Sequence, residues 1–259
     1  MTALLTAQQL CVAFRHQTGR VDVLRDVSLS LEAGEVVGLV GESGSGKSTL
    51  ARALLGLTQV SMGRVCWQGL DVSQLTPRRL RALRPSYQAI FQQPSASLSP
   101  RLTVFQSIAE PLGVPASVLD PRRLEEQTLT AMQEVGLSLA LRDRRPHQLS
   151  GGQCQRVAIA RALVSRPRVL ICDEVVSALD LSVQAQVLNL LMARCRSQGT
   201  AVLFVSHDLS VVRWLSDRVL VMQAGRLVEE GRSDQLFSDP QHAYTKQLIA
   251  ASSPSALPP

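Results

Sequence analysis

The sequence has few aromatic residues, few lysines and no paired cysteines. Aromatic residues make up only 3% of the 259 residues, which argues against a surface that stacks nucleic-acid bases. The five cysteines, at positions 11, 66, 154, 172 and 195, form no Cys-x-x-Cys pair. Their odd number and irregular spacing predict free thiols in a reducing compartment, with no zinc or iron–sulfur site.

Long apolar runs are also missing. No run approaches the roughly 20 apolar residues that are needed to cross a bilayer. Residues 1–10 lack the basic start and apolar stretch of a signal peptide. If the protein works at a membrane, we therefore expect other chains to form the channel.

The charge is basic but consists almost wholly of arginine. The net charge of +6 comes from 27 basic and 21 acidic residues, and only Lys47 and Lys246 are lysines. A solvated basic surface explains the overall charge better than an anionic partner does. Lys47 stands out, because a compact ammonium on a flexible stem suits a tight phosphate site better than a planar guanidinium.

Apolar runs alternate with helical patterns along the chain. Leu50, Leu54 and Leu57 recur at helical spacing, with Gly56 near the expected helix end. Residues 21–31 alternate like a strand at an antiparallel edge. Four apolar runs predict strands that are buried on both faces, at 36–40, 169–172, 201–205 and 218–222. This order predicts an α/β fold with a largely parallel sheet.

The middle of the chain differs from the rest. Residues 94–166 contain Pro/Ser-rich turns and helical patterns at 122–135 and 153–164, which predict an inserted α-helical subdomain. The flanking residues 1–93 and 167–235 then form the two parts of one core, and 236–259 form a C-terminal tail. A basic helical stretch precedes the insertion, and we interpret it as a solvated face, at Arg78, Arg79, Arg81 and Arg84.

A glycine-rich loop carries the clearest motif. Gly41-x-x-x-x-Gly46-Lys47-Ser48 follows a predicted strand and opens a predicted helix, as the phosphate-loop pattern requires. The glycines let backbone N–H groups surround phosphates, and the helix N-terminus favours an anion. Lys47 can reach the β- and γ-phosphates of a nucleotide, and the Ser48 hydroxyl can bind Mg²⁺.

Two carboxylates end the strand predicted at 169–172. Asp173 and Glu174 therefore lie at the carboxyl edge of the sheet, where ligands bind in such folds. We expect Asp173 to hold Mg²⁺ through water and Glu174 to act as general base toward the attacking water. Alternatively, the two acids only cap the following helix.

Ser206, His207 and Asp208 follow another predicted strand. Three adjacent residues of an extended chain cannot converge as a hydrolase triad, so that interpretation fails. His207 alone is more often structural. Beside a γ-phosphate, however, it could donate a hydrogen bond to the transferring group or to Glu174.

The segment Leu149-Ser150-Gly151-Gly152-Gln153 offers a second anion site. Ser150 can cap the helix that begins near Gln153, and the glycines leave N–H groups open. With the residues that follow, this segment resembles the signature motif of ATP-binding cassette (ABC) proteins. Together with the phosphate loop, Asp173-Glu174, 177–180 and His207, the resemblance covers nearly the whole chain. It implies a P-loop NTPase (RecA-like) core.

The resemblance also implies a shared site. Two cassettes meet head to tail, and each ATP lies between one phosphate loop and the partner's signature. Gln92 resembles the glutamine that touches Mg²⁺ and the attacking water, and residues 177–180 would communicate across the dimer. The signature residues that contact the partner's ATP would be Ser150, Gly151, Gly152 and Gln153. The residues that hold the chain's own ATP would be Gly41, Ser43, Gly44, Gly46, Lys47, Ser48, Thr49 and, against adenine, Phe14.

Two further segments suggest the subfamily. Residues 91–101 and 239–245 resemble the coupling loop and end segment of peptide and nickel importer ATPases. Val175 replaces the usual proline after the catalytic glutamate, and Cys154 replaces a frequent arginine; both favour nickel or metallophore importers slightly. No cysteine follows Cys195, unlike in relatives that have a C-terminal iron–sulfur cluster.

The resemblance implies an ATP-hydrolysing subunit, peripheral on the cytoplasmic face of the membrane. Its expected partners are a second ATPase subunit, two permeases and a periplasmic or extracellular substrate-binding protein, with no nucleic acid. A non-transport cassette, such as that of carbon–phosphorus lyase assemblies, is the alternative. DNA-repair and translation cassettes usually carry paired cassettes or large insertions. A third hypothesis is a nucleotide-binding scaffold without turnover.

Overall fold

The computed structural model describes residues 3–16, 19–92, 97–113, 120–175 and 181–252. They fall into two compact units, which are described separately. The first unit comprises the chain up to residue 75 and from 201 onward, and the second comprises residues 76–200. The predicted helical insertion at 94–166 lies wholly within the second unit. The predicted domain limits at residues 93, 166 and 235 stay predictions.

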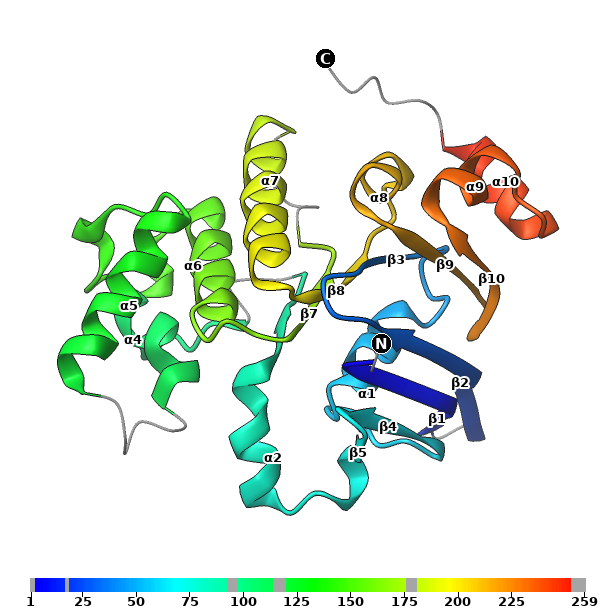
Figure 1. Cartoon of the computed structure of the whole chain (residues 1–259), viewed down its shortest axis with the longest axis horizontal. Coiled ribbons are helices and arrows are strands. Elements are labelled where there is room, and N and C mark those ends of the chain that lie inside the picture. The colour runs from blue at the N-terminus through cyan, green and yellow to red at the C-terminus, as the bar shows by residue number, and fades with distance from the viewer. Residues whose placement is uncertain (1–2, 17–18, 93–96, 114–119, 176–180, 253–259) are drawn as a thin grey trace. The chain divides into compact units, whose positions relative to one another are not determined.

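The first unit contains an antiparallel sheet with the strand order β2-β1-β4-β5 (Figure 1). Its strands are β1 (Leu5–His16), β2 (Gly19–Leu31), β4 (Met62–Trp67) and β5 (Leu70–Asp71). Leu24, Val27 and Leu29 of β2 are buried between exposed neighbours. The antiparallel edge predicted at 21–31 is thus confirmed, because one face of the strand packs and the other meets solvent.

A second group of strands in this unit is mostly parallel. β3 (Val36–Val40) pairs in parallel with β8 (Ala201–Val205) and with β9 (Arg218–Gln223). β10 (Arg226–Arg232) runs antiparallel to β9. Every residue of β3 and β8 is buried, as expected for strands that are apolar on both faces.

The helices of the first unit are α1 (Lys47–Leu54), α8 (Leu209–Leu215), α9 (Ser233–Ser238) and α10 (Ala243–Ala251), with a 3₁₀ turn at Val72–Gln74. The Trp67 indole N–H donates a 2.9 Å hydrogen bond to the Leu54 carbonyl, which ties the end of α1 to β4. The helix end predicted near Gly56 is confirmed, and the helical spacing of Leu57 extends past that end. Gly56, at φ 64°, ends the helix before Leu57, which is 53% exposed.

An ion pair joins the start of β3 to β9. The Arg218 guanidinium donates to both oxygens of the Glu35 carboxylate at 2.7 and 3.1 Å, and to the Ser30 carbonyl at 2.8 Å. It also pairs with Glu230 on β10. Burial raises the pKa of Glu35, but hydrogen bonds from Arg218 and the Glu32 backbone lower it, and the net pKa is below the ordinary value.

The second unit combines a strand pair with helices. β6 (Tyr87–Ile90) and β7 (Val169–Asp173) pair in parallel. The helices are α2 (Pro77–Leu83), α4 (Val104–Ala109), α5 (Pro121–Glu134), α6 (Gly151–Leu163) and α7 (Leu181–Gln198). Short 3₁₀ turns lie at Arg84–Ser86, Glu110–Gly113, Leu139–Leu141 and Pro146–Gln148. α4, α5 and α6 contact one another (Figure 1), as expected for a helical subdomain.

The arginine-rich helix α2 has no buried residue. Arg78, Arg79 and Arg81 are exposed, in agreement with the predicted solvated face, whereas Arg84 is half-buried. Among the described helices, none combines the length and the apolar character that a bilayer crossing requires.

Candidate functional site

The phosphate-loop pattern lies between β3 and α1 in the first unit. Gly41, Gly44 and Gly46 have φ values of 150°, 81° and 109°, which other residues rarely adopt. Within the described part of the chain, no acceptor is found for the N–H groups of Gly44 and Gly46. Unpaired N–H groups beside the start of α1 suit an anion, so the loop fits nucleotide phosphates.

The glycines of this loop serve different needs. A Cβ on Gly41 would lie 2.1 Å from the Met222 carbonyl oxygen on β9, and one on Gly46 would lie 3.0 Å from a Leu24 methyl group. A Cβ on Gly44 would meet nothing within 4 Å. Gly41 and Gly46 are therefore required by close packing, whereas Gly44 is required by its backbone conformation.

Lys47 is the first residue of α1 and is 6% exposed. Its ammonium donates to the Gly41 carbonyl at 2.8 Å, to the Glu42 carbonyl at 2.7 Å and to the Ser45 hydroxyl at 3.4 Å. The loop thus folds around the Lys47 ammonium and holds it in place. Three further predicted contacts share this loop and the first turn of α1: Ser43 and Ser48 are exposed, and Thr49 is half-buried.

His207 also belongs to the first unit. It is the second residue after the end of β8, and its side chain is exposed beside the buried Ser206. The Ser206 hydroxyl accepts the Asp208 N–H at 3.0 Å, and Asp208 caps α8 by accepting N–H groups of the helix. The side chains of Ser206 and Asp208 therefore bind backbone N–H groups. This agrees with the conclusion that Ser206, His207 and Asp208 do not form a hydrolase triad.

The predicted acids lie at one end of the strand pair in the second unit. Asp173 ends β7 and is 4% exposed, and Glu174 follows it at φ 51°. The Gln92 side-chain amide donates a hydrogen bond to the Glu174 carboxylate. Because β6 and β7 are parallel neighbours, their carboxyl ends share an edge, and this brings residues 92 and 174 together.

Val175 fits its site. The side chain is 3% exposed, and its carbonyl accepts a 2.5 Å hydrogen bond from the Gln155 side chain on α6. A proline at this position would restrict the preceding residue to extended conformations. Valine leaves Glu174 free to adopt its left-handed conformation. Gln155 was not predicted from the sequence, since nothing in its spacing indicates a buried amide.

The signature segment forms the start of α6. The Ser150 hydroxyl accepts the Gln153 N–H at 3.2 Å, and the Gln153 side chain accepts the Ser150 N–H at 2.9 Å. The cap by Ser150 is the one that the sequence predicts, whereas the return bond to the Gln153 side chain, which completes a capping box, was not predicted. Gly151 is exposed and Gly152 half-buried, and a Cβ on Gly151 would meet nothing within 4 Å. The open side of Gly151 leaves room for a ligand or a partner.

Cys154 occupies a buried position in the same helix. It is 3% exposed, and its thiol donates to the Pro146 carbonyl at 3.6 Å.

Phe14, the candidate adenine contact, lies on β1 opposite Val21. Both side chains are exposed, by 45% and 51%, and they form an apolar surface on the first unit. The segments 93–96 and 177–180, expected to take part in coupling and in communication, lie outside the described residues.

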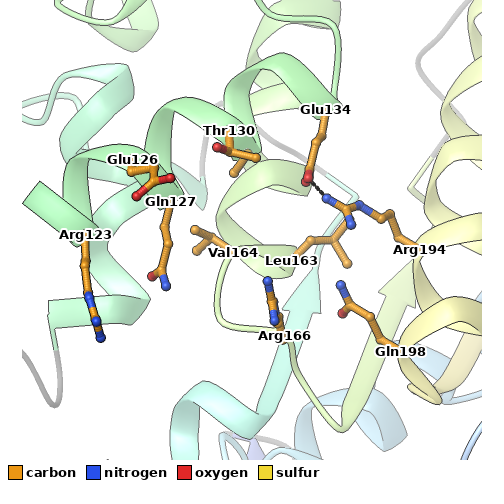
Figure 2. Close-up of a pocket in the computed structure, with 11 residues that line it drawn as sticks. Arg123, Glu126, Gln127, Thr130, Glu134, Leu163, Val164, Arg166, Arg194 and Gln198 are labelled. Atoms are coloured by element: carbon orange, nitrogen blue, oxygen red, sulfur yellow. Dashed lines mark ion pairs between the residues drawn. The ribbon is translucent and has the colours of Figure 1, made fainter. Parts of the chain in front are cut away.

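A separate pocket in the second unit is lined by none of the predicted site residues. It lies among α5, the end of α6 and α7, and its side chains include Arg123, Glu126 and Arg166 (Figure 2). Glu134 and Arg194 form an ion pair across it. Arg123, Glu126 and Arg166 are exposed, and both acids and arginines line the pocket. This pocket is not the nucleotide site.

The chain matches the family model described as "ABC transporter" over residues 24–177. It is 47% identical to the oligopeptide transport ATP-binding protein OppF of Haemophilus influenzae, over 96% of this chain and 77% of the relative. It is 48% identical to the OppF protein of Escherichia coli, over 87% of this chain and 67% of the relative. These names refer to oligopeptides, and they give no support to the sequence-based preference for nickel.

Solved structures agree in fold. The ATP-binding cassette MJ0796, in a dimeric post-hydrolysis state bound to ADP and Pi, has a TM-score of 0.81 and 27% identity, covering 88% of this chain and 98% of that one. The cbiO1 protein of Clostridium perfringens, part of the cbiONQ transporter complex, has a TM-score of 0.78 and 28% identity, with 92% of each chain covered. The predicted α/β cassette fold is thereby confirmed.

Proposed function

The chain belongs to the ABC transporter family, and on that basis we propose that it is the ATP-hydrolysing subunit of an importer for oligopeptides. The named relatives support oligopeptides as the cargo. The observation that carries ATP hydrolysis is the Gln92–Glu174 hydrogen bond at the end of β7, in a chain that also holds Lys47 within an intact phosphate loop.

ATP binding depends on the first unit. The N–H groups of Gly44 and Gly46 and the ammonium of Lys47 supply hydrogen bonds to phosphate oxygens. Phe14 offers an apolar surface to adenine. The solved cassette bound to ADP and Pi supports a nucleotide site in this fold.

Hydrolysis depends on the acids of the second unit. Glu174 accepts a proton from the attacking water, and Gln92 keeps the carboxylate oriented for that transfer. Ser48, Asp173 and Gln92 have the oxygen atoms that a hard cation prefers, and they would hold Mg²⁺. When bound, the cation neutralises charge on the phosphates. His207 donates a hydrogen bond to the transferring phosphoryl group.

A second cassette completes the site. Ser150, Gly151, Gly152 and Gln153 contact ATP that is held by the partner, and the exposed, open side of Gly151 supports such an approach. The dimeric state of the MJ0796 cassette is consistent with this arrangement. Two permeases and a periplasmic or extracellular binding protein complete the importer, with this subunit on the cytoplasmic face of the membrane.

A complementation experiment tests the proposal. A strain that lacks this chain should lose uptake of a labelled oligopeptide, and the wild-type chain should restore it. Glu174→Gln should not restore uptake, because loss of a general base lowers turnover by about 10²–10⁴-fold. The matched control is Glu126→Gln, the same chemical change at an exposed residue of α5.

Other outcomes identify the alternatives. Normal peptide uptake with loss of nickel uptake would reassign the cargo to metal. Normal uptake of both, with loss of growth on phosphonates, would support the carbon–phosphorus lyase cassette. ATP hydrolysis by purified Glu174→Gln protein at the wild-type rate would contradict the catalytic assignment.

A further inference from the structure

Tyr244 of α10 contacts the phosphate loop from the other end of the chain. Its hydroxyl oxygen accepts the Glu42 backbone N–H at 2.9 Å, across 202 residues of sequence. The tyrosine is 5% exposed, so its ring is fixed by packing. Both residues belong to the first unit. A buried phenol thus touches the loop without being part of the loop motif.

This hydrogen bond completes a clamp on a single peptide group. The Gly41 carbonyl and the Glu42 N–H are the two ends of the peptide that joins these residues. The carbonyl accepts from the Lys47 ammonium at 2.8 Å, and the N–H donates to Tyr244. Because a peptide group is planar, holding both ends fixes its orientation.

The clamp is needed because this peptide follows a permissive residue. Gly41 has φ 150°, a conformation from which a glycine can turn at little cost. Its carbonyl depends on the Lys47 ammonium, which is the group that must also serve phosphate. When Lys47 shares its protons with a phosphate, the bond to Tyr244 still restrains the peptide.

Tyr244 is itself held in place. The Glu229 carboxylate on β10 accepts the N–H groups of Gln241 and His242, at 2.7 and 3.0 Å. The His242 ring caps α10 by accepting the Tyr244 N–H at 3.2 Å. A continuous set of hydrogen bonds therefore runs from β10 through the start of α10 to the phosphate loop.

We infer that Tyr244 is a positioning residue for the phosphates of a nucleoside di- or triphosphate: it fixes the Gly41–Glu42 peptide in the form that binds them. The inference rests on the proposed ATP site and deepens it. It assigns to the tail segment 239–245 a task inside the ATPase subunit, in addition to any contact with other subunits.

The variant Tyr244→Phe tests this, since it removes only the hydroxyl. The control is Tyr87→Phe, which removes a hydroxyl from the other tyrosine, buried on β6. Without nucleotide, hydrogen exchange of the Glu42 amide should be about fivefold faster in Tyr244→Phe, the factor that corresponds to one ordinary hydrogen bond. The dissociation constant for ADP should rise by a similar factor, with kcat within twofold. Tyr87→Phe should change neither the Glu42 exchange nor the ADP affinity.

Unchanged Glu42 exchange and unchanged ADP affinity in folded Tyr244→Phe would overturn the inference. If Tyr244→Phe does not fold, Glu229→Gln decides instead: it loosens the start of α10 and should shift both readouts in the same direction by about twofold, and no shift would overturn the inference. Failure of the wild-type chain to bind ADP would contradict the proposed function alone, because the exchange of the Glu42 amide is measured without nucleotide.

Discussion

Gln92 donates a hydrogen bond from its side-chain amide to the Glu174 carboxylate, across 82 residues of sequence. The bond joins the second residue after β6 to the residue that directly follows β7. It holds the carboxylate in one orientation. Catalysis by a general base depends on such orientation, and misplacement by about 1 Å can cost roughly 100-fold in rate.

Gln92→Ala should therefore lower kcat for ATP hydrolysis by about 10- to 100-fold and leave ATP binding within about threefold of wild type. Gln88→Ala is the matched control. Gln88 lies on β6 itself, and its amide donates to the Arg84 carbonyl. Steady-state kinetics and equilibrium binding of ATP separate the two effects. Equal losses of kcat in both variants would show that β6 has merely been destabilised.

Lys47→Met should abolish most ATP binding. The substitution keeps the length of the side chain and removes its charge, and hydrogen bonds to a charged group contribute about 1.5–3 kcal/mol. We expect affinity to fall by roughly 100-fold in isothermal titration. Lys246→Met removes the other lysine, which is exposed on α10, and should bind ATP normally.

Gly151→Val should prevent ATP-dependent dimerisation without affecting the folding of the chain. The added side chain has open space, so the free energy of unfolding should change by no more than about 0.5 kcal/mol. In a Glu174→Gln background, however, ATP should no longer produce a dimer in size-exclusion chromatography, because the valine occupies the approach of the partner's nucleotide. Gly41→Ala is the contrasting variant. Its Cβ would collide with the Met222 carbonyl, and it should be destabilised by about 2 kcal/mol. Normal ATP-dependent dimers of Gly151→Val would contradict the proposed shared site.

Arg218→Met should destabilise the first unit by about 2 kcal/mol, because it leaves the Glu35 carboxylate, 18% exposed, without its cation. The folded-state pKa of Glu35 is lowered, so the pair stabilises the protein above the unfolded pKa, and this contribution is lost as pH falls through the folded pKa. The difference between wild type and variant in urea unfolding should thus shrink in acid. Arg20→Met removes an exposed pair with Asp22 and should change stability by less than about 0.5 kcal/mol at any pH.

The cysteines should differ in reactivity. Cys11 and Cys66 are partly exposed, whereas Cys154, Cys172 and Cys195 are buried. Burial raises the pKa of Cys195 to about 12 and raises that of Cys172 strongly, and the thiolate is the reactive form. A disulfide reagent at pH 8 should label two thiols in the native protein and five in denaturant, as counted by mass spectrometry. Rapid labelling of Cys172 would contradict the buried arrangement around Asp173.

Strands and helix ends that depend on neighbouring residues alone were predictable from the sequence. Residues 36–40 form β3 within the predicted limits, since four apolar side chains around one glycine, before a glycine-rich turn, have few alternatives. The capping of α6 by Ser150 was likewise predictable. The end of α1 near Gly56 was predictable too, since glycine readily adopts the left-handed conformation that ends a helix.

Contacts between distant segments could not be derived from spacing. Gln92 and Glu174 could be placed in one site only through the family resemblance, and their hydrogen bond depends on the pairing of β6 with β7. The contact of Tyr244 with Glu42 was missed, although residues 239–245 were recognised as a subfamily segment. Such contacts depend on how β10 and α10 pack, which no local pattern encodes.

The capping box at the start of α6 determines how the Ser150 hydroxyl can interact with a ligand. The Ser150 oxygen already receives the Gln153 N–H, and the Ser150 N–H is already bound to the Gln153 side chain. What the cap leaves over is the hydroxyl hydrogen of Ser150, at an exposed position. Because these bonds already fix the Ser150 oxygen, its hydroxyl can donate to an incoming anion with little further loss of side-chain entropy. The same bond that starts the helix prepares it to recognise negative charge.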